Sequence, residues 1–134
     1  MHEIVAFRAQ HLSEVMGLFA AERWSYAEDQ ERTSRALTAP GSLSLVALAD
    51  GRVAGIAQTL SDGQVQALLS ILLVAAERRG TGIGRALVQE ALRRTPCIRC
   101  DLISCADAFY QALGFSPVSG FRHTAGPAGA SPAP

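Results

Sequence analysis

The stretch RRGTGIG, residues 78–84, decides how the chain is organised. It separates an apolar run (68–76) from an amphipathic segment (83–94), so the pattern predicts a strand, a glycine-rich turn and the start of a helix. Glycines at alternate positions leave no side chain between a ligand and the backbone. A helix that begins here points unpaired N–H groups at the turn, which favours an anion and above all a phosphate. From the glycines alone, a phosphate cradle and a bare turn with solvated arginines remain equally open.

Length and charge exclude several classes of protein. At 134 residues the chain predicts one domain, and the balance of 12 basic and 12 acidic residues argues against a nucleic-acid binder. The chain has no lysine, which excludes a P-loop lysine and a Schiff-base lysine. The first residues show no basic segment followed by an apolar core, and no apolar run reaches the roughly 18 residues of a membrane span. We therefore expect a cytoplasmic protein without a membrane partner.

The three cysteines invite a redox or zinc interpretation, because Cys97 and Cys100 form a Cys-x-x-Cys pair. A zinc site needs a second pair of ligands, and the histidines are scattered along the chain. The segment 97–104 also reads as a strand, in which alternate residues face opposite ways. We expect ordinary free thiols and no metal site.

The rest of the chain alternates between helical and strand patterns. Asp50-Gly51 is a hairpin signal, and Pro96 and Gly114 end helices. The expected strands cover residues 3–8, 42–49, 52–60, 64–74, 97–104, 115–118 and 121–124, and the expected helices cover 10–22, 28–37, 83–94 and 106–113. The predicted order is β-α-α-β-β-β-α-β-α-β(β). This is an α+β, three-layer fold whose mixed, mostly antiparallel sheet carries helices on both faces, with residues 1–124 as the domain and 125–134 as a disordered tail.

A cluster of aromatic and acidic side chains lies between the first two predicted helices. Its members are Trp24, Tyr26, Glu28 and Asp29. Such a cluster is a candidate substrate-binding surface, and it is equally well read as a loop held by one buried aromatic side chain.

Two motifs together resemble the GCN5-related N-acetyltransferase (GNAT) family. The pyrophosphate signature Arg/Gln-x-x-Gly-x-Gly/Ala maps onto Arg79, Gly82 and Gly84. A second run, of the type Ala-x-x-Phe-Tyr-x-x-Leu-Gly-Phe, maps onto residues 109–115. One helix and one strand separate the motifs, and with the element order the resemblance covers residues 3 to about 124.

A dinucleotide-binding fingerprint explains the glycines less well. It requires Gly-x-Gly-x-x-Gly, and the sixth position counted from Gly82 is Leu87. Asp101 does lie where a ribose-binding acid could sit, about twenty residues further on. A Rossmann unit, however, normally opens its domain, whereas here an antiparallel meander is expected first.

The resemblance implies direct transfer of an acetyl group from acetyl-CoA, with no metal, to an amine of a small molecule or peptide. It implies that a backbone N–H near Leu73 or Val74, where the family opens a bulge, stabilises the oxyanion. Tyr110 is the expected general acid for the leaving thiolate, while no residue stands out as general base. The residues expected to bind acetyl-CoA are Leu72, Leu73, Val74, Arg79, Gly80, Thr81, Gly82, Ile83, Gly84 and Arg85.

Two further expectations follow from the resemblance. Many family members form homodimers, and the abbreviated C-terminal segment of this chain would suit one. The alternative to an enzyme is a GNAT-like module that binds CoA with a sensing or assembly role and transfers nothing.

Overall fold

A five-stranded sheet organises the first of two units, Met1–Leu102 and Ile103–Pro134, in the computed structural model, which describes residues 2–126. The strands follow one another across the sheet in chain order: β1 (His2–Ala6), β2 (Ser42–Ala49), β3 (Arg52–Ser61), β4 (Gln66–Val74) and β5 (Arg99–Asp101). The helices of this unit are α1 (Leu12–Ala21), α2 (Gln30–Leu37) and α3 (Ile83–Arg94), with the short 3-10 helices η1 (Ala9–His11), η2 (Ser25–Glu28) and η3 (Ala76–Arg78). The second unit contains α4 (Asp107–Ala112).

The pairing of the strands confirms the predicted mixed sheet. The first four strands pair antiparallel in sequence, and β4 pairs parallel with β5. The turn between β2 and β3 is the predicted Asp50-Gly51 hairpin, and both of these residues have positive φ angles, 52° and 74°. Such a turn matches the twist of the strands that it joins.

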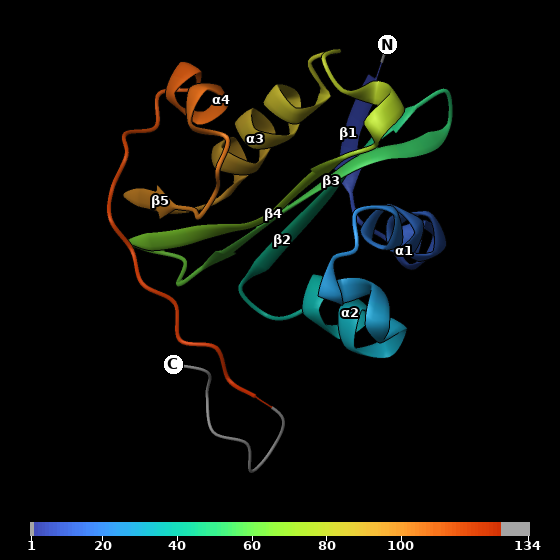
Figure 1. The fold of residues 1–134 in the computed structure, drawn as a ribbon, viewed down its shortest axis with the longest axis horizontal. Coiled ribbons are helices and arrows are strands. Elements are labelled where there is room, and N and C mark those ends of the chain that lie inside the picture. Colours follow the sequence, from blue (N-terminus) through green and yellow to red (C-terminus); the bar gives the residue numbers. More distant parts are fainter. Residues whose placement is uncertain (1, 127–134) are drawn as a thin grey trace. The chain divides into compact units, whose positions relative to one another are not determined.

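Helices cover both faces of the sheet, as the sequence predicts (Figure 1). Val15 and Phe19 of α1 are fully buried and belong to one cluster with Ile56 of β3 and Ile71 of β4. On the opposite face, α3 buries Leu87 and Val88, and its Ile83 and Leu87 side chains pack over Gly55 of β3. The predicted α+β, three-layer fold class is therefore confirmed.

The prediction of two terminal strands, over 115–118 and 121–124, is wrong. Up to residue 126, where the described part of the chain ends, no strand follows α4, so the observed order ends in β-α rather than β-α-β(β). Val118 and Phe121 are 76% and 100% exposed, and Pro117 has no N–H to offer to a sheet. The apolar residues of this segment thus find no partner strand that would fix them.

The other boundaries differ less. The predicted strand 97–104 is reduced to the three residues of β5. From residue 127 on, the predicted disordered tail 125–134 lies outside the described residues. Across residues 2–126, no helix is both long enough and apolar enough to cross a membrane.

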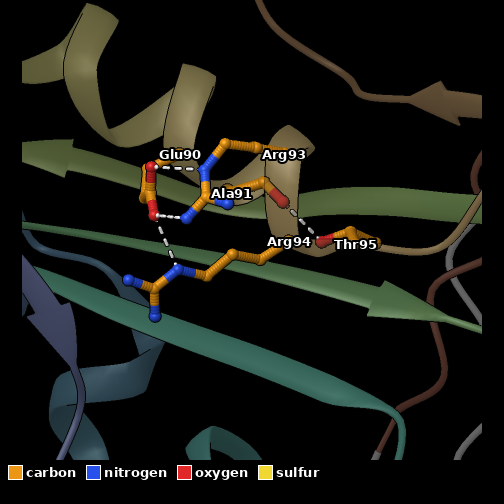
Figure 2. Close-up of polar contacts among 5 residues, drawn as sticks. All are labelled: Glu90, Ala91, Arg93, Arg94 and Thr95. Carbon is orange, nitrogen blue, oxygen red and sulfur yellow. Dashed lines mark hydrogen bonds and ion pairs between the residues drawn. The ribbon is translucent and has the colours of Figure 1, made fainter.

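The C-terminal end of α3 is fixed by polar contacts, which Figure 2 shows. Both arginines that follow Glu90 in the helix donate to its carboxylate, Arg94 Nε at 2.7 Å. The hydroxyl of Thr95 donates to Ala91 O at 2.6 Å and is also in contact, at 2.6 Å, with the hydroxyl of Thr59 on β3. The helix end is therefore tied both to itself and to the sheet.

We expect Gly55→Ala to lower the free energy of unfolding by about 1–3 kcal/mol, because a Cβ here would overpack the contact between α3 and the sheet. The added atom would lie 3.0 Å from Leu73 O and 3.0 Å from Leu87 Cδ1. Gly17→Ala is the control: Gly17 lies inside α1 with nothing within 4 Å of the added atom, so it should gain about 0.5–1 kcal/mol. Urea denaturation measures both, and equal effects of the two substitutions would contradict the close contact.

We expect Glu90→Gln to destabilise the protein at pH 7 but not near pH 2. Hydrogen bonds from Arg93 and Arg94 lower the pKa of Glu90 to about 2, from an ordinary value of 4.5. Because the folded pKa is depressed, the stabilisation is complete above pH 4.5 and is lost as the pH falls through 2. Denaturation of both proteins between pH 7 and pH 2 measures the difference. Glu31→Gln, which removes an exposed ion pair with Arg35 at 3.9 Å, should have little effect throughout.

Candidate functional site

One edge of β4 is open over most of its length. β5 pairs only with Gln66–Leu68 at the beginning of β4 (Figure 1). From Leu69 to Val74, β3 is the only strand of the described chain that pairs with β4. The backbone groups on the other edge can therefore pair with an extended ligand, as they would with another strand.

The register of the ladder shows which backbone groups face this open edge. The hydrogen bond from Ala75 N to Ala54 O (2.8 Å) continues the antiparallel pattern of β3 and β4. Because alternate residues in such a ladder point their amides to opposite edges, Leu73 faces β3. Leu72 and Val74 face the open edge. Of the two oxyanion donors expected from the sequence, only Val74 lies on the accessible side.

The bulge in β4 lies earlier than the expected place near residues 72–74. Gln58 pairs with Ile71 and Thr59 with Leu69, so Ser70 is the extra residue on β4. The bulge follows directly on the part of β4 that β5 covers. The strand thus changes register at the point where its edge becomes open.

The glycine-rich turn connects this edge to α3. Gly80 and Gly82 have φ angles of 77° and 88°, a left-handed conformation that strongly favours glycine. Gly82 caps α3, and its carbonyl accepts the first helical hydrogen bond, from Ala86 N at 3.0 Å. The N–H groups of Ile83 and Gly84 in the first turn have no partner within the helix. Unpaired N–H groups at a helix start are what an anion site would use, and the phosphate-binding role of this turn stays a prediction.

Arg79 bridges the turn, the end of β4 and the end of α1. Its Nε donates to Val74 O at 3.1 Å, and its Nη2 pairs with the carboxylate of Glu22, the residue that follows α1. The hydroxyl of Thr81 donates to Arg78 O and closes the turn. Sequence reasoning did not identify Glu22 as the partner of Arg79, because residues 57 positions apart meet only through the fold.

A pocket of about 260 Å³ lies along η2 and α2. Its lining includes Tyr26, Glu28 and Asp29, three of the four residues predicted to bind a substrate. The other lining residues are Ser25, Arg32, Thr33 and Ala36. Positions 29, 32, 33 and 36 share one helical face, a spacing that would have indicated them once Asp29 was chosen.

Two residues of the predicted cluster have structural roles. Trp24 lies outside the pocket lining and packs against Phe19 and Tyr26, with ring centroids 5.8 and 6.4 Å apart. Asp29 caps α2, and its Oδ1 accepts a hydrogen bond from Arg32 N at 3.0 Å. These contacts fit a loop held by an aromatic side chain, and the substrate-binding role of the cluster stays a prediction.

Tyr110 belongs to α4 in the second unit. Its ring packs edge-on against Phe109 and Phe115, with centroids 4.9 and 5.6 Å away. Partial burial raises the pKa of its phenol above 10, and a hydrogen bond with Ser104 partly offsets this shift. The phenol therefore holds its proton more tightly than an ordinary tyrosine does.

The thiols and the acidic side chains form no metal site in the described chain. Cys97, Cys100 and Cys105 are free, and between residues 2 and 126 no three His, Cys, Asp or Glu side chains are placed to hold an ion.

Comparison with known proteins assigns the family. The family model of the acetyltransferase (GNAT) domain matches residues 40–117. This range covers more than half of the chain and includes both the glycine-rich turn and α4. No curated protein matches.

Solved structures share the fold. A transcriptional regulator from Bacillus halodurans is 19% identical with a TM-score of 0.78, over 92% of this chain and 99% of its own. A GNAT-family acetyltransferase from Streptococcus pneumoniae is 24% identical with a TM-score of 0.78, over 93% and 98%. An acetyltransferase from Trypanosoma brucei is 19% identical with a TM-score of 0.76, over 93% and 99%. With the family model, the open edge of β4 and the left-handed glycine turn, the chain belongs to the GNAT family of acetyltransferases.

Proposed function

We propose that this protein transfers the acetyl group of acetyl-CoA directly to an amine of a small molecule or peptide. The observation that carries the proposal is the continuity of the open edge of β4 with the glycine turn and the first turn of α3. An extended chain with amide groups, ending in a pyrophosphate, fits this sequence of backbone donors and acceptors. The pantetheine arm and the pyrophosphate of acetyl-CoA have this chemistry.

The residues available for acetyl-CoA fall into two groups. Leu72 and Val74 would pair through their backbone with the pantetheine arm, and Leu73 would support them from within the sheet. The turn would hold the pyrophosphate through its backbone amides and the guanidinium groups beside it. The residues of this group are Arg79, Gly80, Thr81, Gly82, Ile83, Gly84 and Arg85. Val74 O already accepts from Arg79, so this arginine would have to release it for the arm to pair there.

The thioester supplies the acetyl group, and the chain supplies positioning and proton transfer. As the amine nitrogen bonds to the acetyl carbon, an N–H on the open edge, from Leu72 or Val74, would stabilise the negative charge on the acetyl oxygen. Breaking of the C–S bond leaves a thiolate, to which the phenol of Tyr110 would give its proton. The nitrogen loses its extra proton to water, and water returns one to Tyr110.

The pocket beside α2 is the proposed acceptor site. Glu28 and Asp29 offer negative charge to an amine, and Arg32 offers positive charge to an acidic group on the same molecule. Trp24 would contribute by supporting Tyr26 rather than by contact. The proposal includes a cytoplasmic location, no nucleic-acid or membrane partner, and the homodimer that many family members form.

A module that binds CoA without transfer is the second candidate, because β4 carries no acidic side chain that could serve as base. Release of thiol from acetyl-CoA in the presence of a panel of primary amines separates the two functions. Release with at least one amine supports the enzyme. Binding of CoA without release on any amine supports the module.

We expect Gly82→Asp to weaken CoA binding at least a hundredfold, because the new carboxylate would lie beside the negatively charged pyrophosphate. Two like unit charges about 4 Å apart repel each other by roughly 4 kcal/mol near a protein surface. Isothermal titration calorimetry with CoA measures the loss. Gly63→Asp is the matched control: Gly63 has a φ of 82°, close to the 88° of Gly82, and an added Cβ meets nothing within 4 Å at either position. The control shares the strain and should bind CoA normally. Normal affinity of Gly82→Asp would remove the turn from the CoA site.

We expect Tyr110→Phe to lower kcat by about 10²–10⁴-fold, the usual contribution of a general acid, with unchanged CoA affinity. The ring contacts with Phe109 and Phe115 remain in the variant, so the loss of the hydrogen bond with Ser104 should lower its melting temperature only slightly. Because burial raises the pKa of the phenol, kcat of the wild type should fall as the acid deprotonates only at a higher pH than for an ordinary tyrosine. An unchanged kcat across pH in the variant would exclude Tyr110 as the acid.

A further inference from the structure

A chain of hydrogen bonds connects the bulge of β4 to the wall of the pocket. Ser70 Oγ contacts Gln58 Oε1 at 2.8 Å, and Gln58 Nε2 contacts Ala36 O at 2.8 Å. Gln58 is only 2% exposed, and Ala36 lines the pocket beside α2. One buried side chain therefore joins the backbone irregularity of β4 to the proposed acceptor site.

The direction of each hydrogen bond in this chain is fixed. Ala36 offers only a carbonyl oxygen, so the amide nitrogen of Gln58 must face it and donate. The amide oxygen of Gln58 consequently faces Ser70, and the hydroxyl of Ser70 must donate to it. The single hydrogen of this hydroxyl is thus committed, and the lone pairs of Ser70 Oγ remain available as acceptors.

The position of Ser70 suits contact with both substrates. Its side chain lies on the face of the sheet that α1 and α2 cover, because it meets Gln58 there. Ser70 is half-buried rather than enclosed, and it is the second residue of the open stretch of β4, which begins at Leu69. This hydroxyl is joined through Gln58 to Ala36 in the pocket wall, and it belongs to the strand whose open edge is proposed to hold the thioester.

We propose that Ser70 Oγ accepts a hydrogen bond from an N–H of the acceptor amine and thereby aims the nitrogen lone pair at the acetyl carbon. The inference rests on the proposed function. Gln58 is the positioning residue, because it acts only through Ser70. Ser70 takes no proton: its own hydrogen stays bonded to Oγ and points at Gln58 Oε1, and the extra proton of the attacking nitrogen leaves to water. The site therefore selects a nucleophile that carries a hydrogen beside its lone pair, as a neutral primary amine does.

The test compares three variants of the full chain. The acceptor is whichever of glycine, spermidine, glucosamine and a short peptide with a free N-terminus gives the fastest thiol release with the wild type. Ser70→Ala should lower kcat/KM for this amine about tenfold, the effect of one lost hydrogen bond, and leave the KM for acetyl-CoA unchanged. Ser70→Thr keeps the hydroxyl and should restore kcat/KM to within about twofold.

Thr59→Val is the control for a purely structural effect. Thr59 is buried on the α3 face of the same sheet, where its hydroxyl meets that of Thr95. This variant should lower the melting temperature as Ser70→Ala does, without changing kcat/KM for the amine.

Two outcomes would overturn the role of Ser70 and leave the proposed function standing. They are an unchanged amine kcat/KM in Ser70→Ala, or an equal loss in the parameters for acetyl-CoA. A wild type that binds no CoA by calorimetry and releases no thiol would instead overturn the proposed function, and the inference with it.

Discussion

Strands β4 and β5 stop pairing after Leu68, and this is the constraint on which the rest of the structure depends. Strand β5 is only three residues long, so β4 loses its second partner after Leu68. Unpaired backbone donors and acceptors cost free energy when they are kept from water, and a ligand that pairs with them recovers it. The glycine turn and α3 follow this edge without interruption. The edge proposed to hold the donor is thus a consequence of one short strand.

Close packing of α3 on β3 brings the helix to this edge. Gly55 lies opposite Val74 at the end of β4, and its missing side chain leaves room for Ile83 and Leu87. Ile83 is the first residue of α3, so the contact that needs a glycine also fixes where the helix begins. The helix N-terminus, and the partial positive charge that it carries, therefore lie beside the last residues of the open strand.

Local sequence patterns predicted the regular elements well, whereas contacts between distant residues could not be read from the sequence. Strand 42–49 and helix 83–94 have the predicted bounds, because alternation and helical spacing are properties of a few neighbouring residues. The terminal strands failed because Phe121 and its neighbours have the composition of a strand but no partner. Other features depend on how distant segments meet, which a single strand does not encode. They are the pairing of Arg79 with Glu22, the bulge at Ser70 and the hydrogen bond between Gln58 and Ser70.

The bulge in β4 places the Ser70 side chain on the face that α1 and α2 cover, beside the edge proposed to hold the donor. In a regular strand, side chains alternate between the two faces of the sheet, and backbone amides alternate between its two edges. An extra residue breaks this order, so Ser70 and Ile71 sit together where the open edge begins. Both side chains share the face that α1 and α2 cover, while the amides of Leu72 and Val74 stay on the open edge. The irregularity thus adds a polar side chain to this face, beside the edge proposed to hold the donor.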